Sequence, residues 1–150
     1  MRTYLVVMDD SNEGRVALRF AARRAARTGG AVEILSLIPP QEFVQWGGVQ
    51  AAIEEEARLR AEAAVLQASG AIFEEAGIRP TITIREGDAV KVIGDVLKRG
   101  DIASLVLGAP AEGGPGPLIT HFAGSPAGTL PCPLVIVPGT LSDEALDRLS

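Results

Sequence analysis

Residues 4–12 read YLVVMDDSN, and this segment constrains the architecture more than any other part of the chain. Five consecutive apolar residues without polar alternation are typical of a short strand that is buried on both faces of a sheet. The polar residues that follow favour a turn, and Ser11 or Asn12 can cap the N-terminus of a helix. The segment therefore predicts a strand, a turn and a helix start in direct succession.

Short apolar runs and amphipathic segments continue to alternate along the chain. Further strands are expected at 31–38, 81–84, 102–107 and 133–138, and helices at 12–28, 51–76, 88–100, 118–130 (interrupted near 124–126) and 141–150. Parallel neighbours in a sheet need long crossover connections, which helices supply. We therefore expect one α/β domain over residues 1–150, with an open, doubly wound sheet of five parallel strands.

Two segments fit this pattern less well. The connection at 41–50 contains Phe43 and Trp46 and shows no clean period, so we expect it to be only partly ordered. We expect its aromatic side chains to pack either over a crevice of the domain or against a partner subunit. The tail at 141–150 is expected to be a short helix capped by Ser142 that either covers a subunit interface or forms a mobile end.

The composition excludes several classes of function. The 150 residues carry a formal net charge of -5, which argues against a nucleic-acid surface. Cys132 and His121 are the only residues of their kinds, so a thiolate zinc site or a Cys-His nucleophile pair is not expected. No apolar run approaches the roughly 20 residues of a membrane span, and Asp9 interrupts the first run too early for a signal peptide. We expect a cytoplasmic protein.

Candidate ligand-binding residues follow from the expected topology. Ligands of doubly wound sheets bind at the carboxyl ends of the strands, where the strand order reverses. Asp9 follows the first strand and can accept a hydrogen bond from a ribose hydroxyl or a base amine. The glycine-rich loop at 108–116 and the pair Gly124 and Ser125 offer backbone amides to a phosphate. The alternative is that these glycines only serve turns and that Asp9 only caps a helix.

At these residues the sequence resembles the universal stress protein family, and the likeness extends from end to end. Residues 5–11 resemble the strand-Asp-x-Ser start of that family. Gly114, followed after nine residues by Gly124 and Ser125, resembles the second half of its nucleotide signature, and residues 130–137 resemble its final Pro-Cys-Pro strand. The resemblance implies a Rossmann-like sheet with the strand order 3-2-1-4-5 and a stress-response or regulatory role.

The resemblance also implies a ligand, namely ATP or another adenine nucleotide, with Mg²⁺ offsetting its charge. It assigns Asp9, Leu37 and Leu107 to the adenosine end, with Leu37 acting through its backbone. It assigns the phosphates to Gly108, Gly114, Gly124 and Ser125. It carries no catalytic residue to this chain.

The loop at 108–116 departs from the family pattern. Ala111 stands where the first glycine of the signature is expected, and the distance from Gly108 to Gly114 is three residues longer. Three prolines in or after this loop lack amide donors, and Glu112 adds negative charge where a triphosphate would lie. Two other functions therefore stay open: a dimeric interaction module that binds no nucleotide, and a slow ATP hydrolase, although no positioned base or phosphate-binding lysine is evident.

Two surface features bear on partners. An apolar edge strand is a template for pairing, and in the family the last strand commonly pairs with its own copy across a twofold axis. We therefore expect a homodimer through Leu134, Val135, Ile136 and Val137. Arginines recur at every fourth position from residue 15 to residue 27, and we interpret this row as a solvated helix face that offsets the acidic excess elsewhere.

Overall fold

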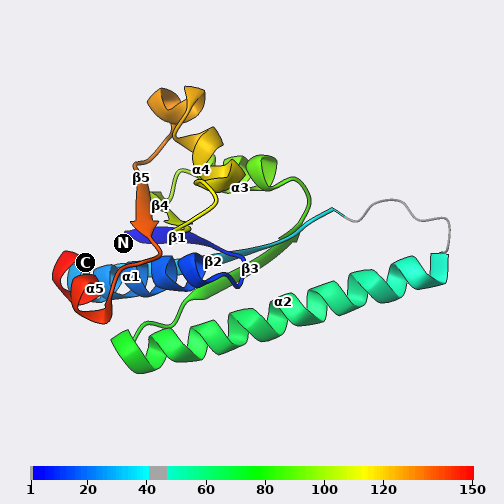
Figure 1. The fold of residues 1–150 in the computed structure, drawn as a ribbon, viewed down its shortest axis with the longest axis horizontal. Helices are drawn as coiled ribbons and strands as arrows, with labels where there is room; N and C mark the ends of the chain where they lie inside the picture. Colours follow the sequence, from blue (N-terminus) through cyan, green and yellow to red (C-terminus); the bar gives the residue numbers. More distant parts are fainter. Residues whose placement is uncertain (1, 41–46) are drawn as a thin grey trace.

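The computed structural model describes residues 2–40 and 47–150 (Figure 1). In chain order the elements are β1 (Thr3–Met8), α1 (Asn12–Thr28), β2 (Ala31–Ile38), α2 (Gly47–Ala76), β3 (Thr81–Glu86), α3 (Ala89–Leu97), β4 (Ile102–Ala109), α4 (Gly116–Phe122), the 3-10 helix η1 (Ser125–Thr129), β5 (Leu134–Pro138) and α5 (Asp143–Leu149). Among the described residues, none of these helices is long and apolar enough to cross a membrane.

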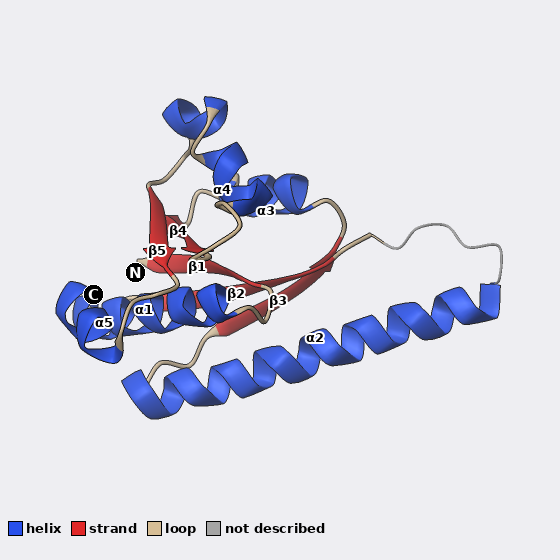
Figure 2. Cartoon of the chain, viewed as in Figure 1, coloured by secondary structure: helices blue, strands red, loops and turns tan. Residues whose placement is uncertain are grey.

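The five strands form one parallel sheet in the order β3-β2-β1-β4-β5 (Figure 2), which confirms the predicted topology. β1 lies in the middle, with Val6 opposite Ile34 of β2 and Val106 of β4. Helices cover both faces of this central strand, so its side chains point alternately into two apolar layers. This position explains why the run at residues 4–8 is continuously apolar.

Each face of the sheet has its own core. Helices α1, α2 and α5 lie on one face, and α3 and α4 lie on the other (Figure 1). Val6 packs into the first core with Ile72 of α2 and Leu146 of α5. Leu5 of the same strand packs into the second core with Ile93 of α3. The two cores therefore share β1 and hold its carboxyl end between α1 and α4.

The predicted helix caps are confirmed. The hydroxyl of Ser11 accepts a hydrogen bond from the Gly14 backbone N–H at 3.0 Å, and α1 ends at Gly29, whose φ of 68° is left-handed. Asp88 caps α3 and Ser142 caps α5 in the same way as Ser11 caps α1. These local signals fix where each crossover helix begins.

Several predicted boundaries move. α2 begins at Gly47 and not at residue 51, so part of the connection expected to be irregular is helical. The other residues of that connection, 41–46, lie outside the described residues. β3 and β4 each extend two residues beyond their predicted ends, because pairing with a neighbouring strand continues after the apolar pattern stops. The interruption predicted near Gly124 is confirmed, since α4 ends before it and η1 follows.

The first and last arginines of the row in α1 are exposed, as expected, but the two between them are partly buried and do not form a solvated face. Arg19 contacts Glu75 of α2 at 2.9 Å and Asp143 of α5 at 2.6 Å. Arg23 also contacts both helices, Glu75 of α2 at 3.2 Å and Asp147 of α5 at 2.7 Å. These two arginines therefore tie α1 to two other helices, and their acidic partners are too distant in the sequence for helical spacing to reveal them.

The C-terminal tail is a docked helix. Leu146 of α5 is fully buried in the core that α5 shares with α1, and both aspartates of α5 pair with arginines of α1. This packing contradicts the expectation of a mobile end. The other expectation, that the tail covers a subunit interface, stays a prediction.

Candidate functional site

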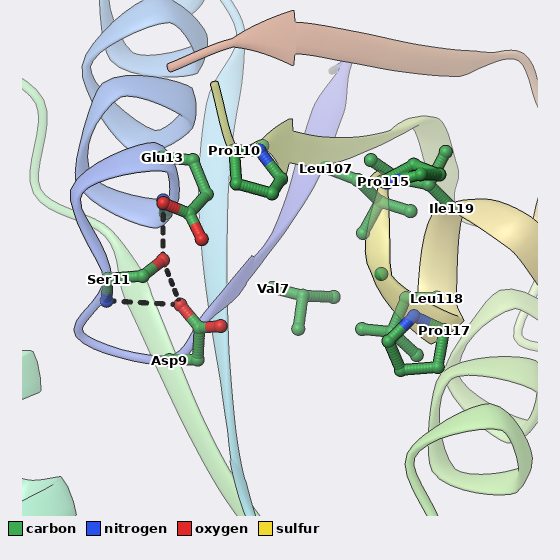
Figure 3. Close-up of a pocket in the computed structure, with 13 residues that line it drawn as sticks. Val7, Asp9, Ser11, Glu13, Leu107, Pro110, Pro115, Pro117, Leu118 and Ile119 are labelled. Atoms are coloured by element: carbon green, nitrogen blue, oxygen red, sulfur yellow. Dashed lines mark hydrogen bonds between the residues drawn. The ribbon is translucent and has the colours of Figure 1, made fainter. Parts of the chain in front are cut away.

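A pocket of about 260 Å³ lies at the carboxyl ends of β1 and β4, where the strand order reverses. We call it the β1–β4 pocket. Asp9 and Glu13 form one wall, Pro115 and Ile119 face them, and Leu107 of β4 lies at the base (Figure 3). Its volume is just below the roughly 300–1,000 Å³ of typical small-molecule sites. The position is the one that the doubly wound topology predicts for a ligand.

The turn after β1 fixes the carboxylate of Asp9. Its Oδ1 accepts hydrogen bonds from the backbone N–H of Ser11, at 3.1 Å, and from the Ser11 hydroxyl. The next residue, Asp10, has a φ of 63°, and Arg15 holds it through its carbonyl and its carboxylate. Strained backbone of this kind is maintained only where the surroundings impose it. The second oxygen of Asp9 is directed into the pocket (Figure 3).

Glycine at residue 108 is required by packing. A Cβ atom there would lie 2.1 Å from the carbonyl oxygen of Glu13, in the first turn of α1. Only a residue without a side chain therefore lets β4 end so close to α1. The contact brings the wall that carries Asp9 and Glu13 next to the end of β4, so Gly108 shapes the pocket even before any ligand is considered.

The loop after β4 offers fewer backbone donors than its glycine content suggests. Gly113, Gly114 and Gly116 all have left-handed φ values, between 82° and 85°. Of these three glycines, Gly116 lines the β1–β4 pocket, and it stands between Pro115 and Pro117, which have no N–H. Across this three-residue stretch of the wall, a phosphate would meet one backbone donor.

A second pocket, of about 380 Å³, lies between the end of β2 and helix α2. We call it the β2–α2 pocket. Leu37 and Pro39 line it at the end of β2, and Arg60 lines it from α2. Asp9 lines both pockets, so it stands between them at the edge of the sheet. Leu37 and Leu107, the other two residues assigned to an adenosine, therefore lie on opposite sides of Asp9.

The remaining predicted phosphate residues are placed differently. Among the described residues that line the two pockets, Gly114, Gly124 and Ser125 are absent. A Cβ at Gly124 would lie 2.8 Å from the carbonyl oxygen of Thr120, so the end of α4 by itself requires a glycine there. Ser125 begins η1. The structure thus brings together Asp9, Leu107 and Gly108, but not the second half of the sequence signature.

The charge of the β1–β4 pocket is negative. Asp9 and Glu13 both contribute carboxylates to its wall, and none of its described lining residues is Lys or Arg. Glu13 was missed as a pocket residue because an acidic residue in the first turn of a helix already has an explanation in the helix dipole. In the described part of the chain, no group of three His, Cys, Asp or Glu residues could hold a metal ion. A triphosphate would therefore meet two like charges here, with no protein cation beside it.

Most of the chain matches a family model. The family model described as "Universal stress protein family" matches residues 1–138. No curated protein sequence matches this chain significantly.

The solved structures with a similar fold include three from the same family. The universal stress protein UspA from Lactobacillus plantarum is 18% identical, with a TM-score of 0.76, and the match covers 91% of this chain and 97% of that one. The universal stress protein from Archaeoglobus fulgidus in complex with dAMP is 17% identical, with a TM-score of 0.62 over 91% of this chain and 97% of that one. A family protein from Arabidopsis thaliana with AMP bound is 18% identical, with a TM-score of 0.55 over 97% and 99%. At these identities the likeness concerns the fold.

Proposed function

Because the chain belongs to the universal stress protein family, we propose that it is a stress-response protein that senses an adenine nucleoside monophosphate at the β1–β4 pocket. One observation carries the proposal. Asp9 is held by Ser11 through one oxygen and directs the other into a pocket at the switch point of the sheet, beside Gly108. A fixed carboxylate oxygen at this place is suited to accept a hydrogen bond from a ribose hydroxyl.

The adenine base belongs in the β2–α2 pocket. Since Asp9 lines both pockets, one ligand whose sugar lies at Asp9 reaches both. The backbone of Leu37 then lies at the edge of the base, and the apolar side chains of α2 cover it. The phosphate extends the other way, toward Gly116 in the β1–β4 pocket.

The negative wall favours one phosphate over three. A monophosphate needs few donors, and Gly116, which lines this pocket, carries an N–H where the prolines on both sides have none. A triphosphate carries more charge past Asp9 and Glu13, where it requires Mg²⁺ to offset the repulsion. Two of the similar structures carry AMP or dAMP, which agrees with this choice.

Calorimetric titration with adenosine, AMP, ADP and ATP tests this ligand class. We expect AMP to bind most tightly in the absence of Mg²⁺ and affinity to fall with each added phosphate. Added Mg²⁺ should improve ATP binding and leave AMP binding nearly unchanged. Tighter binding of ATP than of AMP without Mg²⁺ would exclude the monophosphate proposal, and no binding of any of the four would favour the interaction module.

We further propose that this family member is a homodimer through β5. This strand pairs with β4 on one side, and Ile136 is 42% exposed on it, so it offers a free edge with an apolar side chain. Leu134, Val135 and Val137 extend the edge, and a second copy related by a twofold axis would pair with it. A dimer of this kind that binds none of the nucleotides above is the alternative function that the sequence left open.

A further inference from the structure

Helix α2 carries an apolar stripe that its own chain leaves uncovered. Leu59, Leu66 and Phe73 are exposed to 54%, 67% and 45% of their surfaces. Ala63 and Gly70 lie between them and are exposed as well. We call these five residues the α2 seam. The helix faces its own core with other residues, namely Val65, Ala68 and Ile72, which are buried.

The spacing of the α2 seam is that of a coiled coil. Its members follow one another at intervals of four, three, four and three residues, so Leu59, Leu66 and Phe73 take the d positions of a heptad repeat and Ala63 and Gly70 the a positions. Packing against the sheet does not require this pattern, because the buried residues of α2 already supply that contact. A heptad seam on a second face of the same helix is suited to a partner helix.

We propose that the α2 seam pairs with the α2 seam of a second copy of this chain, in antiparallel orientation. In antiparallel coiled coils an a position of one helix meets a d position of the other. Here this pairing sets Leu66 against Gly70 of the second copy, Phe73 against its Ala63, and Leu59 beside its Gly77. A Cβ at Gly70 would have open space around it, so this position can receive a large side chain from the partner.

The charges beside the seam select the same register. Arg60 and Glu74 both flank the d positions on one side of α2, and both are exposed; Arg60 also pairs with Glu56 one turn earlier on its own helix. In the antiparallel register Arg60 lies next to Glu74 of the second copy, and the twofold axis repeats the pair. A parallel pair would instead stack small residues on small ones at Ala63 and Gly70, which leaves gaps, and would keep Arg60 and Glu74 about 21 Å apart along the axis.

Charge exchange tests this pairing, with Ile136→Lys present throughout so that pairing through β5 does not contribute. Sedimentation velocity over a wide concentration range should show that the Ile136→Lys protein dimerises. Adding Arg60→Glu should weaken the dimer at least tenfold. Adding Glu74→Arg to that variant should restore the dimer affinity to within about threefold of that of the Ile136→Lys protein. The control Arg58→Glu lies on the same helix but away from the seam and should change the affinity less than twofold.

Either of two results would overturn the proposal: an Ile136→Lys protein that stays monomeric at every concentration, or a charge exchange that fails to restore the dimer. Circular dichroism of each variant establishes that it is folded. If the Ile136→Lys protein does not fold, cross-linking of a protein that keeps Ile136 tests the same pairing. With Cys132→Ser, a bismaleimide should link two copies through Gln67→Cys, near the twofold axis. It should not link them through Glu55→Cys, near the far end of the seam, and equal linking at both sites would contradict antiparallel pairing.

Discussion

Gly108 lies against the backbone of Glu13 so closely that a Cβ on Gly108 would approach the Glu13 carbonyl oxygen to 2.1 Å. The contact joins the end of β4 to the first turn of α1 and forms one corner of the β1–β4 pocket. The glycine therefore has a structural role that is separate from any contact with a phosphate.

We expect Gly108→Ala to destabilise the fold by about 1–3 kcal/mol, because one of two backbone segments must move to admit the methyl group. The midpoint of urea denaturation measures the change. Gly94→Ala is the matched control, since Gly94 lies inside α3 with open space around a Cβ. It should stabilise the protein by about 0.5–1 kcal/mol. Equal midpoints for Gly108→Ala and the wild type would show that the close contact is not maintained in solution.

Removing one carboxylate from the pocket should change ligand selectivity. We expect Glu13→Gln to increase ATP affinity about fivefold and AMP affinity less than twofold, because repulsion from Glu13 acts on each additional phosphate. Calorimetry in low salt measures both affinities. The difference between the effects of Glu13→Gln on ATP affinity and on AMP affinity should decrease as added salt screens the repulsion. If Glu13→Gln leaves the ratio of ATP to AMP affinity unchanged, Glu13 does not contribute to the preference for one phosphate.

Docking of α5 should depend on acid pH. The hydrogen bond from Arg19 and the positive charge of its guanidinium hold the pKa of Asp143 below its ordinary value near 3.8. A carboxyl with a lowered pKa in the folded state stabilises the fold above its unfolded-state pKa and loses that contribution as pH falls through the folded-state value. We therefore expect the contact to weaken below about pH 3.8.

The methyl resonances of Leu146 report this change, because Leu146 is buried where α5 meets α1. They should shift with pH in the wild type between pH 5 and pH 2. In Asp143→Asn the part of the shift due to this carboxyl should disappear. An identical profile in both proteins would mean that the pair of Arg19 and Asp143 does not contribute to docking.

Pairing through β5 should be removed by Ile136→Lys. A charged side chain on an exposed edge strand opposes pairing with another copy, and Ile136 is exposed enough to be replaced without disturbing the core. Light scattering on an eluting sample should show a smaller assembly than that of the wild type. The control Ile82→Lys places the same charge on β3, the opposite edge of the sheet, where Ile82 is 37% exposed, and should leave the assembly unchanged. An unchanged mass for Ile136→Lys would assign any dimer to another surface.

The fold could be predicted because its signals are local. The apolar run at residues 4–8 identified the central strand, and the caps at Ser11, Asp88 and Ser142 identified three helix starts. Contacts between segments that are distant in the sequence could not be predicted from such local signals. The arginines of α1 gave no sign of their partners on α2 and α5. Glu33, a charged residue in β2, is buried with two distant partners, Arg99 at 2.7 Å and the Thr83 hydroxyl at 3.2 Å.

The candidate site was only partly predictable for the same reason. Asp9 and Gly108 directly follow or end central strands, so the topology alone brings them to one edge. Gly114 was chosen by its spacing from Gly124, but an irregular loop with left-handed glycines does not preserve such spacing in three dimensions. Glu13 enters the pocket through the orientation of α1, which depends on the close approach of Gly108.

The central claim is that Asp9 holds the sugar of an adenine nucleoside monophosphate, and calorimetric titration of wild type and Asp9→Asn with AMP tests it most directly. Asparagine keeps an oxygen for the turn at Ser11 but replaces the oxygen that faces the pocket with a donor. Because a hydrogen bond to a charged group is lost, we expect Asp9→Asn to bind AMP at least about tenfold more weakly than the wild type. The control Asp101→Asn should bind AMP as the wild type does. Equal AMP affinity in the wild type and Asp9→Asn would contradict the account.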